Sequence, residues 1–163
     1  MRAAPPTRTD LQTPPLGAEL EVVVEVPRFG LVKWELHGGR RRLGYISPFP
    51  CPFNYGFVPD TLAPDGDPLD AVVLGARRRS GTRIRGVLVA ALDFVDDGTP
   101  DPKLVLCPDG YTLQHRDRKD VLTFFRFYAY ARALLNRLKG KRGPCRCEGI
   151  RWASPARQET LGA

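Results

Sequence analysis

The chain contains 163 residues with a formal net charge of +7, of which 42% are hydrophobic and 26% are charged. These proportions are typical of a globular domain, and they exclude collagen-like, intrinsically disordered and membrane-spanning compositions. The positive charge favours an anionic partner, and by itself it leaves nucleic acid, an anionic membrane surface and a small phosphate compound open.

The two ends of the chain differ in composition from its centre. Residues 1–18 combine prolines and charged side chains without a continuous apolar stretch, so the sequence predicts a flexible N-terminal arm. A single domain is expected over residues 19–155, followed by a C-terminal tail over residues 156–163. Without the hydrophobic segment of a signal peptide, the four cysteines are expected to be reduced thiols in a cytoplasmic protein.

The domain begins with segments that are typical of β-strands. Residues 19–26 read ELEVVVEV, and residues 31–36 read LVKWEL after a short turn. Since successive side chains of a strand point to opposite faces, Lys33 and Glu35 are expected to share one face. A glycine- and arginine-rich hairpin loop then leads to another extended segment at residues 43–47.

The next segment, residues 48–66, is rich in proline, aromatic and turn-forming residues and is predicted to be an irregular, functional loop. Apolar residues at helical spacing predict one main helix over residues 120–138, closed by Gly140. The continuous apolar or extended segments that predict the remaining strands are residues 71–74, 84–94, 103–107 and 145–152. Short strands, one helix, 16 prolines and 16 glycines together predict a mainly β (α+β) fold.

Three carboxylates lie within six residues at Asp65-Gly66-Asp67-Pro68-Leu69-Asp70. These carboxylates repel one another unless cations neutralise them, and all-oxygen ligands select hard ions such as Mg²⁺ or Mn²⁺. A solvated Asp-Gly turn without an ion is the alternative. A calcium loop of the EF-hand type is excluded, because Asp70 and Ala76 stand where that loop requires glycine and glutamate.

The sequence around these carboxylates, CPFNYGFVPDTLAPDGDPLD at residues 51–70, closely resembles the signature of the family I soluble inorganic pyrophosphatases, or inorganic diphosphatases. Residues 23–35 resemble the glutamate strand and the K-x-E strand of that family. Residues 96–103, DDGTPDPK, are similar to its second acidic loop. The resemblance extends over roughly residues 19–107 and identifies the chain as a divergent member.

This resemblance implies a five-stranded OB-like β-barrel with one main C-terminal helix packed on it. It also implies hydrolysis of inorganic pyrophosphate to two orthophosphates by metal-activated water, with Mg²⁺ as cofactor and Mn²⁺ as a substitute. The expected partners are pyrophosphate, divalent metal ions and further copies of the same chain. Neither a membrane nor nucleic acid is expected as a partner.

The resemblance also implies roles for individual residues. The expected catalytic residues are Asp67, acting as general base, with Tyr55 and Lys33. The residues expected to hold phosphate oxygens are Lys33, Arg42, Tyr55, Lys103 and Tyr128. The carboxylates expected to bind or support the metal ions are Asp65, Asp70, Asp96, Asp101, Glu25 and Glu35, and among them Asp96 would serve the metals that arrive with the substrate.

Three positions depart from the family pattern. Cys51 replaces a tyrosine, and Leu43 stands where an arginine is expected, so that Arg42 is the nearest candidate. The helix lacks the Tyr-Lys pair that closes over the substrate in the family, and Tyr128 or Tyr130 is expected to supply the hydroxyl instead. Because of these departures, the first alternative is a pyrophosphatase-like protein with reduced or lost catalysis. An OB-type nucleic-acid-binding domain that uses the scattered arginines is the second alternative.

Overall fold

The computed structural model describes residues 13–37, 40–46 and 49–154. Most of the predicted N-terminal arm and the tail predicted at residues 156–163 lie outside this part. The strands are β1 (Glu19–Val26), β2 (Val32–His37), β3 (Arg40–Ile46), β4 (Asn54–Phe57), β5 (Asp70–Val73), β6 (Arg83–Asp96), β7 (Thr99–Pro100), β8 (Lys103–Pro108) and β9 (Arg146–Trp152). The helix α1 spans His115–Leu138.

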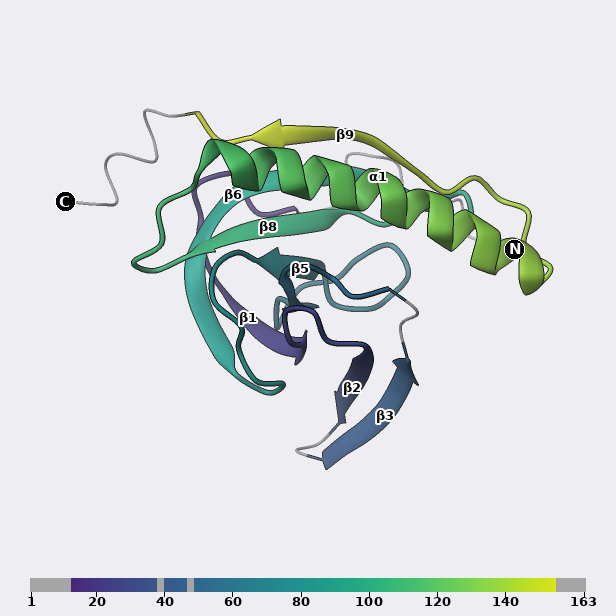
Figure 1. Cartoon of the computed structure of the whole chain (residues 1–163), viewed down its shortest axis with the longest axis horizontal. Coiled ribbons are helices and arrows are strands. Elements are labelled where there is room, and N and C mark those ends of the chain that lie inside the picture. Colours follow the sequence, from purple (N-terminus) through teal and green to yellow (C-terminus); the bar gives the residue numbers. More distant parts are fainter. Residues whose placement is uncertain (1–12, 38–39, 47–48, 155–163) are drawn as a thin grey trace, which may run out of the picture.

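Five of the strands close into a ring. The order of neighbours is β1, β4, β5, β8 and β6, and β6 pairs back with β1. All of these pairings are antiparallel except that of β5 with β8, which is parallel. β9 adds to β6, while β2 and β3 form a separate hairpin that projects from the ring (Figure 1). The predicted mainly β fold with a closed five-stranded sheet is therefore confirmed.

Strands β5 and β8 of the ring are buried on both faces. In β5, Ala71 and Val73 join one hydrophobic cluster, while Val72 between them joins a second cluster that includes Phe125 of α1. The second cluster thus fills the space between the ring and the helix, and the first lies on the opposite face. Burial on both faces explains why these strands are continuously apolar and do not alternate with polar residues.

The helix lies alongside β9 on one side of the sheet (Figure 1). It begins at His115. The sequence predicted a start at residue 120, because the first turn of the helix is polar and carries no apolar periodicity. The Asp117 carboxylate accepts the Gln114 backbone N–H at 2.8 Å and so stabilises the start at His115. The predicted end is confirmed, and Gly140 has a φ of 78° just beyond it. No helical segment in the described residues combines the length and hydrophobicity needed to span a lipid bilayer.

Two sequence predictions about loops are wrong, because both segments belong to strands. Residues 54–57 were expected to be irregular but form β4, because β1 and β5 provide hydrogen-bonding partners on both of its edges. Gly56 is required there, since a Cβ atom at this position would overlap the Val23 carbonyl oxygen of β1. The segment at residues 40–42, expected to be a loop, is the beginning of β3.

Candidate active site

The parallel pairing of β5 and β8 brings acidic and basic residues together at the beginning of both strands. Asp70 and Lys103 are opposite each other in the register. The Lys103 ammonium lies 2.5 Å from Asp70 Oδ2 and 2.7 Å from Asp101 Oδ2. From the neighbouring strand β4, the Tyr55 hydroxyl donates a hydrogen bond to the same Asp70 oxygen at 2.8 Å. We call these four residues, Tyr55, Asp70, Asp101 and Lys103, the acidic cluster.

Electrostatics within the acidic cluster favour the charged form of Lys103 and disfavour the charged form of Asp101. Burial alone would lower the pKa of Lys103, whose side chain is 3% exposed, but Asp70 and Asp101 raise it above its ordinary value. Burial opposes ionisation of Asp70, yet Lys103 holds the pKa of Asp70 below its usual range. Burial raises the pKa of Asp101, and the negative charges of Asp70 and Asp65 add to this rise despite Lys103. The cluster therefore carries surplus negative charge.

The loop between β4 and β5 carries two more of the predicted carboxylates. Asp65 and Asp67 are exposed, and the Asp67 backbone N–H donates to Asp65 Oδ1 at 3.0 Å in a local turn. Gly66 between them has a φ of 90°, a conformation that glycine adopts without strain. Buried Leu69 anchors the end of the loop, and its N–H donates to the Thr61 hydroxyl at 2.9 Å. The end of the loop is thus anchored in the core, while its two carboxylates face the solvent.

The N-terminal part of the predicted site is only partly assembled. Glu25, at the end of β1, is 7% exposed and forms an ion pair with Lys33 of β2 at 3.2 Å. The Glu35 side chain lies outside the described part of the structure. Arg42 is exposed on β3, in the hairpin that is separate from the ring. The structure thus joins Glu25 to Lys33 and leaves Arg42 at the surface.

Asp96, at the end of β6, has a different environment. Its Oδ2 accepts a hydrogen bond from Arg132 Nε at 3.0 Å, and its Oδ1 accepts one from Asn136 Nδ2 at 2.7 Å. The Cys145 thiol also donates to Oδ1, at 3.3 Å. Burial opposes ionisation, but Arg132 and the two other donors hold the pKa of Asp96 below its usual value. We call Asp96, Arg132, Asn136 and Cys145 the helix-facing cluster.

The sequence interpretation missed Arg132, Asn136 and Cys145. The signal for the first two was present, because they continue the inward-facing positions Val121, Phe125 and Ala129 at steps of three and four residues. A polar residue on the buried face of a helix requires a partner, and Asn136 is only 2% exposed.

Tyr128 is the helix tyrosine that lies on the side of the site. Its ring packs against Phe94 of β6, with the ring centroids 5.6 Å apart. The Lys103 ammonium lies 5.8 Å from the same Phe94 ring, and Tyr128 contributes to the raised pKa of Lys103. Tyr130, by contrast, is 73% exposed. Of the two tyrosines predicted to supply a hydroxyl, Tyr128 is the one whose ring packs beside Phe94 and Lys103.

The donors of the site match a hard divalent ion in chemistry. Among the described residues, no three His, Cys, Asp or Glu side chains are already close enough to hold a metal together. Asp65, Asp70 and Asp101 nevertheless offer oxygen atoms alone, and Lys103 is the cation that Asp70 and Asp101 share. Oxygen donors with surplus negative charge suit ions such as Mg²⁺.

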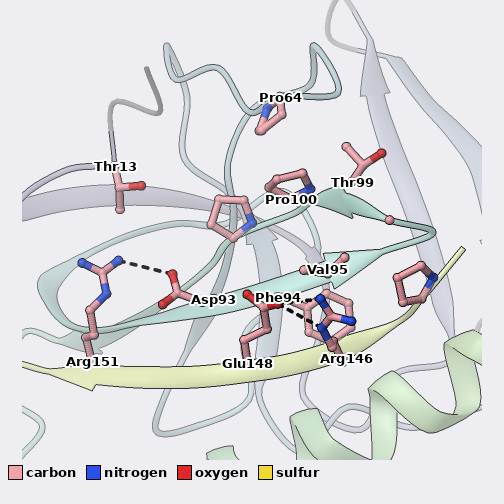
Figure 2. Close-up of a pocket in the computed structure, with 13 residues that line it drawn as sticks. Thr13, Pro64, Asp93, Phe94, Val95, Thr99, Pro100, Arg146, Glu148 and Arg151 are labelled. Carbon is pink, nitrogen blue, oxygen red and sulfur yellow. Dashed lines mark hydrogen bonds and ion pairs between the residues drawn. The ribbon is translucent and has the colours of Figure 1, made fainter. Parts of the chain in front are cut away.

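A groove of about 960 Å³ lies beside β6, β7 and β9 (Figure 2). None of the predicted site residues lines it. The charges in the groove are paired, Arg151 with Asp93 at 3.6 Å and Arg146 with Glu148 at 2.9 Å. Because its charges are balanced, the groove lacks the surplus charge that makes the acidic cluster the better candidate.

Comparison with known proteins identifies relatives of the chain. An inorganic pyrophosphatase from Aeropyrum pernix is 40% identical over 95 residues, which cover 55% of this chain and 53% of that protein. A soluble inorganic pyrophosphatase from Oryza sativa subsp. indica is 35% identical over 118 residues, covering 66% and 54%. The matched region thus spans about half the length of these curated relatives.

Solved structures agree over more of the chain. The inorganic pyrophosphatase of Thermus thermophilus superposes with a TM-score of 0.68 and 27% identity, covering 93% of this chain and 94% of that one. The enzyme of Neisseria gonorrhoeae gives 0.68 and 26%, covering 89% and 88%. The sequence model of the family, described as inorganic pyrophosphatase, matches residues 22–134. Since this match includes most of the ring and of the helix, the chain belongs to the inorganic pyrophosphatase family.

Proposed function

We propose that this protein hydrolyses inorganic pyrophosphate to two orthophosphates with the help of divalent metal ions. The family is metal-dependent, and we propose Mg²⁺ as the ion, with Mn²⁺ as a substitute. The observation that carries the proposal is the acidic cluster, in which one buried lysine is shared by two carboxylates next to the exposed Asp65 and Asp67. A site with this charge attracts cations first and a polyanion only together with them.

In this proposal Asp65, Asp70 and Asp101 hold the metal ions, and Glu25 and Glu35 support them. Bound metal would neutralise the substrate and lower the pKa of an attacking water. The protein's own contribution begins with Asp67, which accepts the proton of that water. Its exposure on an anchored loop supports this role, because a general base must reach a solvent-derived nucleophile.

Substrate oxygens are assigned to the basic and hydroxyl groups around the acidic cluster. For Lys33 of β2 this is supported by its contribution to the lowered pKa of Asp70. For Tyr128 of α1 it is supported by the packing of its ring against Phe94, next to Lys103, and Arg42 would approach from the β2–β3 hairpin. Lys103 and Tyr55 already donate to Asp70, so they also keep that carboxylate ionised and oriented. Positioning of this kind matters because phosphoryl transfer depends mainly on alignment and charge.

A direct assay tests the proposal. Purified protein is mixed with pyrophosphate and Mg²⁺, orthophosphate is followed, and EDTA is added to show metal dependence. Asp67→Asn and Asp70→Asn are expected to lose most of the release, whereas Asp109→Asn, on an exposed turn after β8, serves as the matched control. Absence of metal-dependent release from the parent protein would overturn the assignment.

Two further measurements separate the alternatives. Binding of the non-hydrolysable analogue imidodiphosphate without turnover of pyrophosphate would indicate a family member that has lost catalysis. Salt-dependent binding of an oligonucleotide, without phosphate release, would indicate the nucleic-acid-binding alternative.

We also propose that the protein is a homo-oligomer in the cytoplasm. Large apolar side chains recur every three or four residues on the outer face of α1, and all of them are exposed: Phe127, Tyr130, Leu134 and Leu138. An exposed apolar stripe of this kind favours association. The four cysteines are unpaired, which agrees with a reducing compartment. Sedimentation of the parent chain and of Leu134→Glu tests the association, and a monomeric parent would contradict it.

A further inference from the structure

Asp96 was expected to serve metals that arrive with the substrate, but its carboxylate is enclosed by protein donors. Arg132 and Asn136 approach from α1, at 3.0 and 2.7 Å, and the Cys145 thiol approaches at 3.3 Å. Each carboxylate oxygen therefore has at least one donor. A metal ion that used Asp96 would have to displace these donors.

The enclosure is held in place by further hydrogen bonds. Cys145 Sγ accepts hydrogen bonds from Asn136 Nδ2 at 3.2 Å and from the Asp97 backbone N–H at 3.4 Å. The Gly143 N–H donates to Asp97 Oδ1 at 2.8 Å, and the Gly98 N–H donates to the Pro144 carbonyl at 2.9 Å. These bonds join the segment before β9 to the turn after β6, so the arrangement does not depend on one surface ion pair.

The charges of the helix-facing cluster are balanced. Arg132 contributes one positive charge and Asp96 one negative charge, whereas in the acidic cluster Lys103 is shared by two carboxylates. A divalent ion next to Asp96 would lie beside the guanidinium group and be repelled by it. The Arg132 side chain is still 30% exposed, so an anion can reach it.

On the basis of the proposed function, we propose that Arg132, held by Asp96, supplies the positive charge that a divalent ion on Asp96 would otherwise bring to the substrate. Asp96 is then a positioning residue for an arginine and not a metal ligand. Tyr128 lies one helical turn before Arg132, and its ring packs against Phe94, which also lies beside the Lys103 ammonium. The helix thereby presents a hydroxyl and a cation four residues apart, in place of the missing Tyr-Lys pair.

The test is the number of Mn²⁺ ions bound per chain at saturating imidodiphosphate, measured by equilibrium dialysis and metal analysis. Asp96→Asn is expected to bind as many ions as the parent protein. Arg132→Gln is expected to bind one ion more, because the repelling guanidinium group is gone and Asp96 Oδ2 loses the Arg132 donor, while Asn136 and Cys145 still donate to Oδ1. The double variant Arg132→Gln/Asp96→Asn should return to the parent number.

Two control variants keep the result specific. Arg132→Lys retains the positive charge and should retain the parent number, and Arg137→Gln changes an exposed arginine of the same helix and should have no effect. One ion fewer in Asp96→Asn, or no additional ion in Arg132→Gln, would overturn the proposal. If Asp96→Asn does not fold, as judged by thermal melting, the comparison of Arg132→Gln with Arg137→Gln still decides it.

The ion count does not depend on turnover, because imidodiphosphate is not hydrolysed. A parent protein that releases no orthophosphate but shows the expected counts would contradict the proposed function alone. A parent protein that releases orthophosphate and loses an ion in Asp96→Asn would contradict the role of Arg132 alone.

Discussion

At the paired beginnings of β5 and β8, one lysine is shared by two carboxylates, whereas at the end of β6 one arginine pairs with one carboxylate that has additional hydrogen-bond donors. The two clusters use similar groups in different proportions. Burial and the neighbouring carboxylates raise the pKa of Asp101 despite the shared lysine, whereas Arg132 holds the pKa of Asp96 below its usual value although burial opposes this. The first arrangement is suited to binding cations, and the second is suited to holding a fixed geometry.

The largest effect is expected from removing the shared cation. Lys103→Met would leave two carboxylates without their buried partner, and it should lower the free energy of unfolding by about 3–5 kcal/mol. Urea unfolding followed by circular dichroism measures this change, with exposed Lys139→Met as the control. Added Mg²⁺ should restore part of the loss, since it can take over the neutralisation. A change of the same small size in both variants would mean that Lys103 does not balance the cluster.

Asp67→Asn separates chemistry from stability in the same region. We expect turnover of pyrophosphate to fall by about 10²–10⁴-fold, because the variant lacks the carboxylate that we propose as the proton acceptor. The free energy of unfolding should stay within about 0.5 kcal/mol of the parent, since Asp67 is exposed. Steady-state kinetics and urea unfolding on the same preparation provide both values. Unchanged turnover would remove Asp67 from the mechanism.

Arg132→Met probes the balanced cluster and should cost less than Lys103→Met. We expect a loss of about 1–2 kcal/mol in the free energy of unfolding, because Asp96 keeps the donors Asn136 and Cys145. The measurement is the same urea unfolding, with Arg137→Met as the control on the helix surface. A loss equal to that of Lys103→Met would remove the contrast between the two clusters.

The smallest effect concerns pH. The folded pKa of Asp96 is lowered by Arg132, so its contribution to stability is present above the unfolded pKa of about 3.9 and is lost as pH falls through the folded pKa. The pKa of Asp101 is raised, so its contribution has the opposite sign and declines as pH rises through its folded pKa.

Melting temperatures in EDTA between about pH 2 and pH 6 measure both effects. The difference between the parent protein and Asp96→Asn should shrink towards acid pH, and the difference from Asp101→Asn should change in the reverse direction. Parallel curves for the two variants would show that the carboxylates titrate alike.

Long strands and the helix were predictable because each has a local pattern. The run of β-branched residues at β1, the apolar stretch of β6 and the helical spacing before Gly140 all gave the correct element type. β4 was not predictable, because its four residues form a strand only between β1 and β5. Arg132 and Asn136 lay on the inward stripe of the helix, but their partner Asp96 is far away in the sequence.

The sequence by itself determined the mainly β class, the family and the Asp65–Asp70 motif, since these depend on local composition and on the order of neighbouring residues. Only the tertiary structure decided how many carboxylates form an ion pair with each cation. The parallel register of β5 with β8 places Lys103 beside Asp70, and the docking of α1 places Arg132 on Asp96. Charge balance depends on distances of a few ångströms between distant segments, and only the folded chain sets those distances.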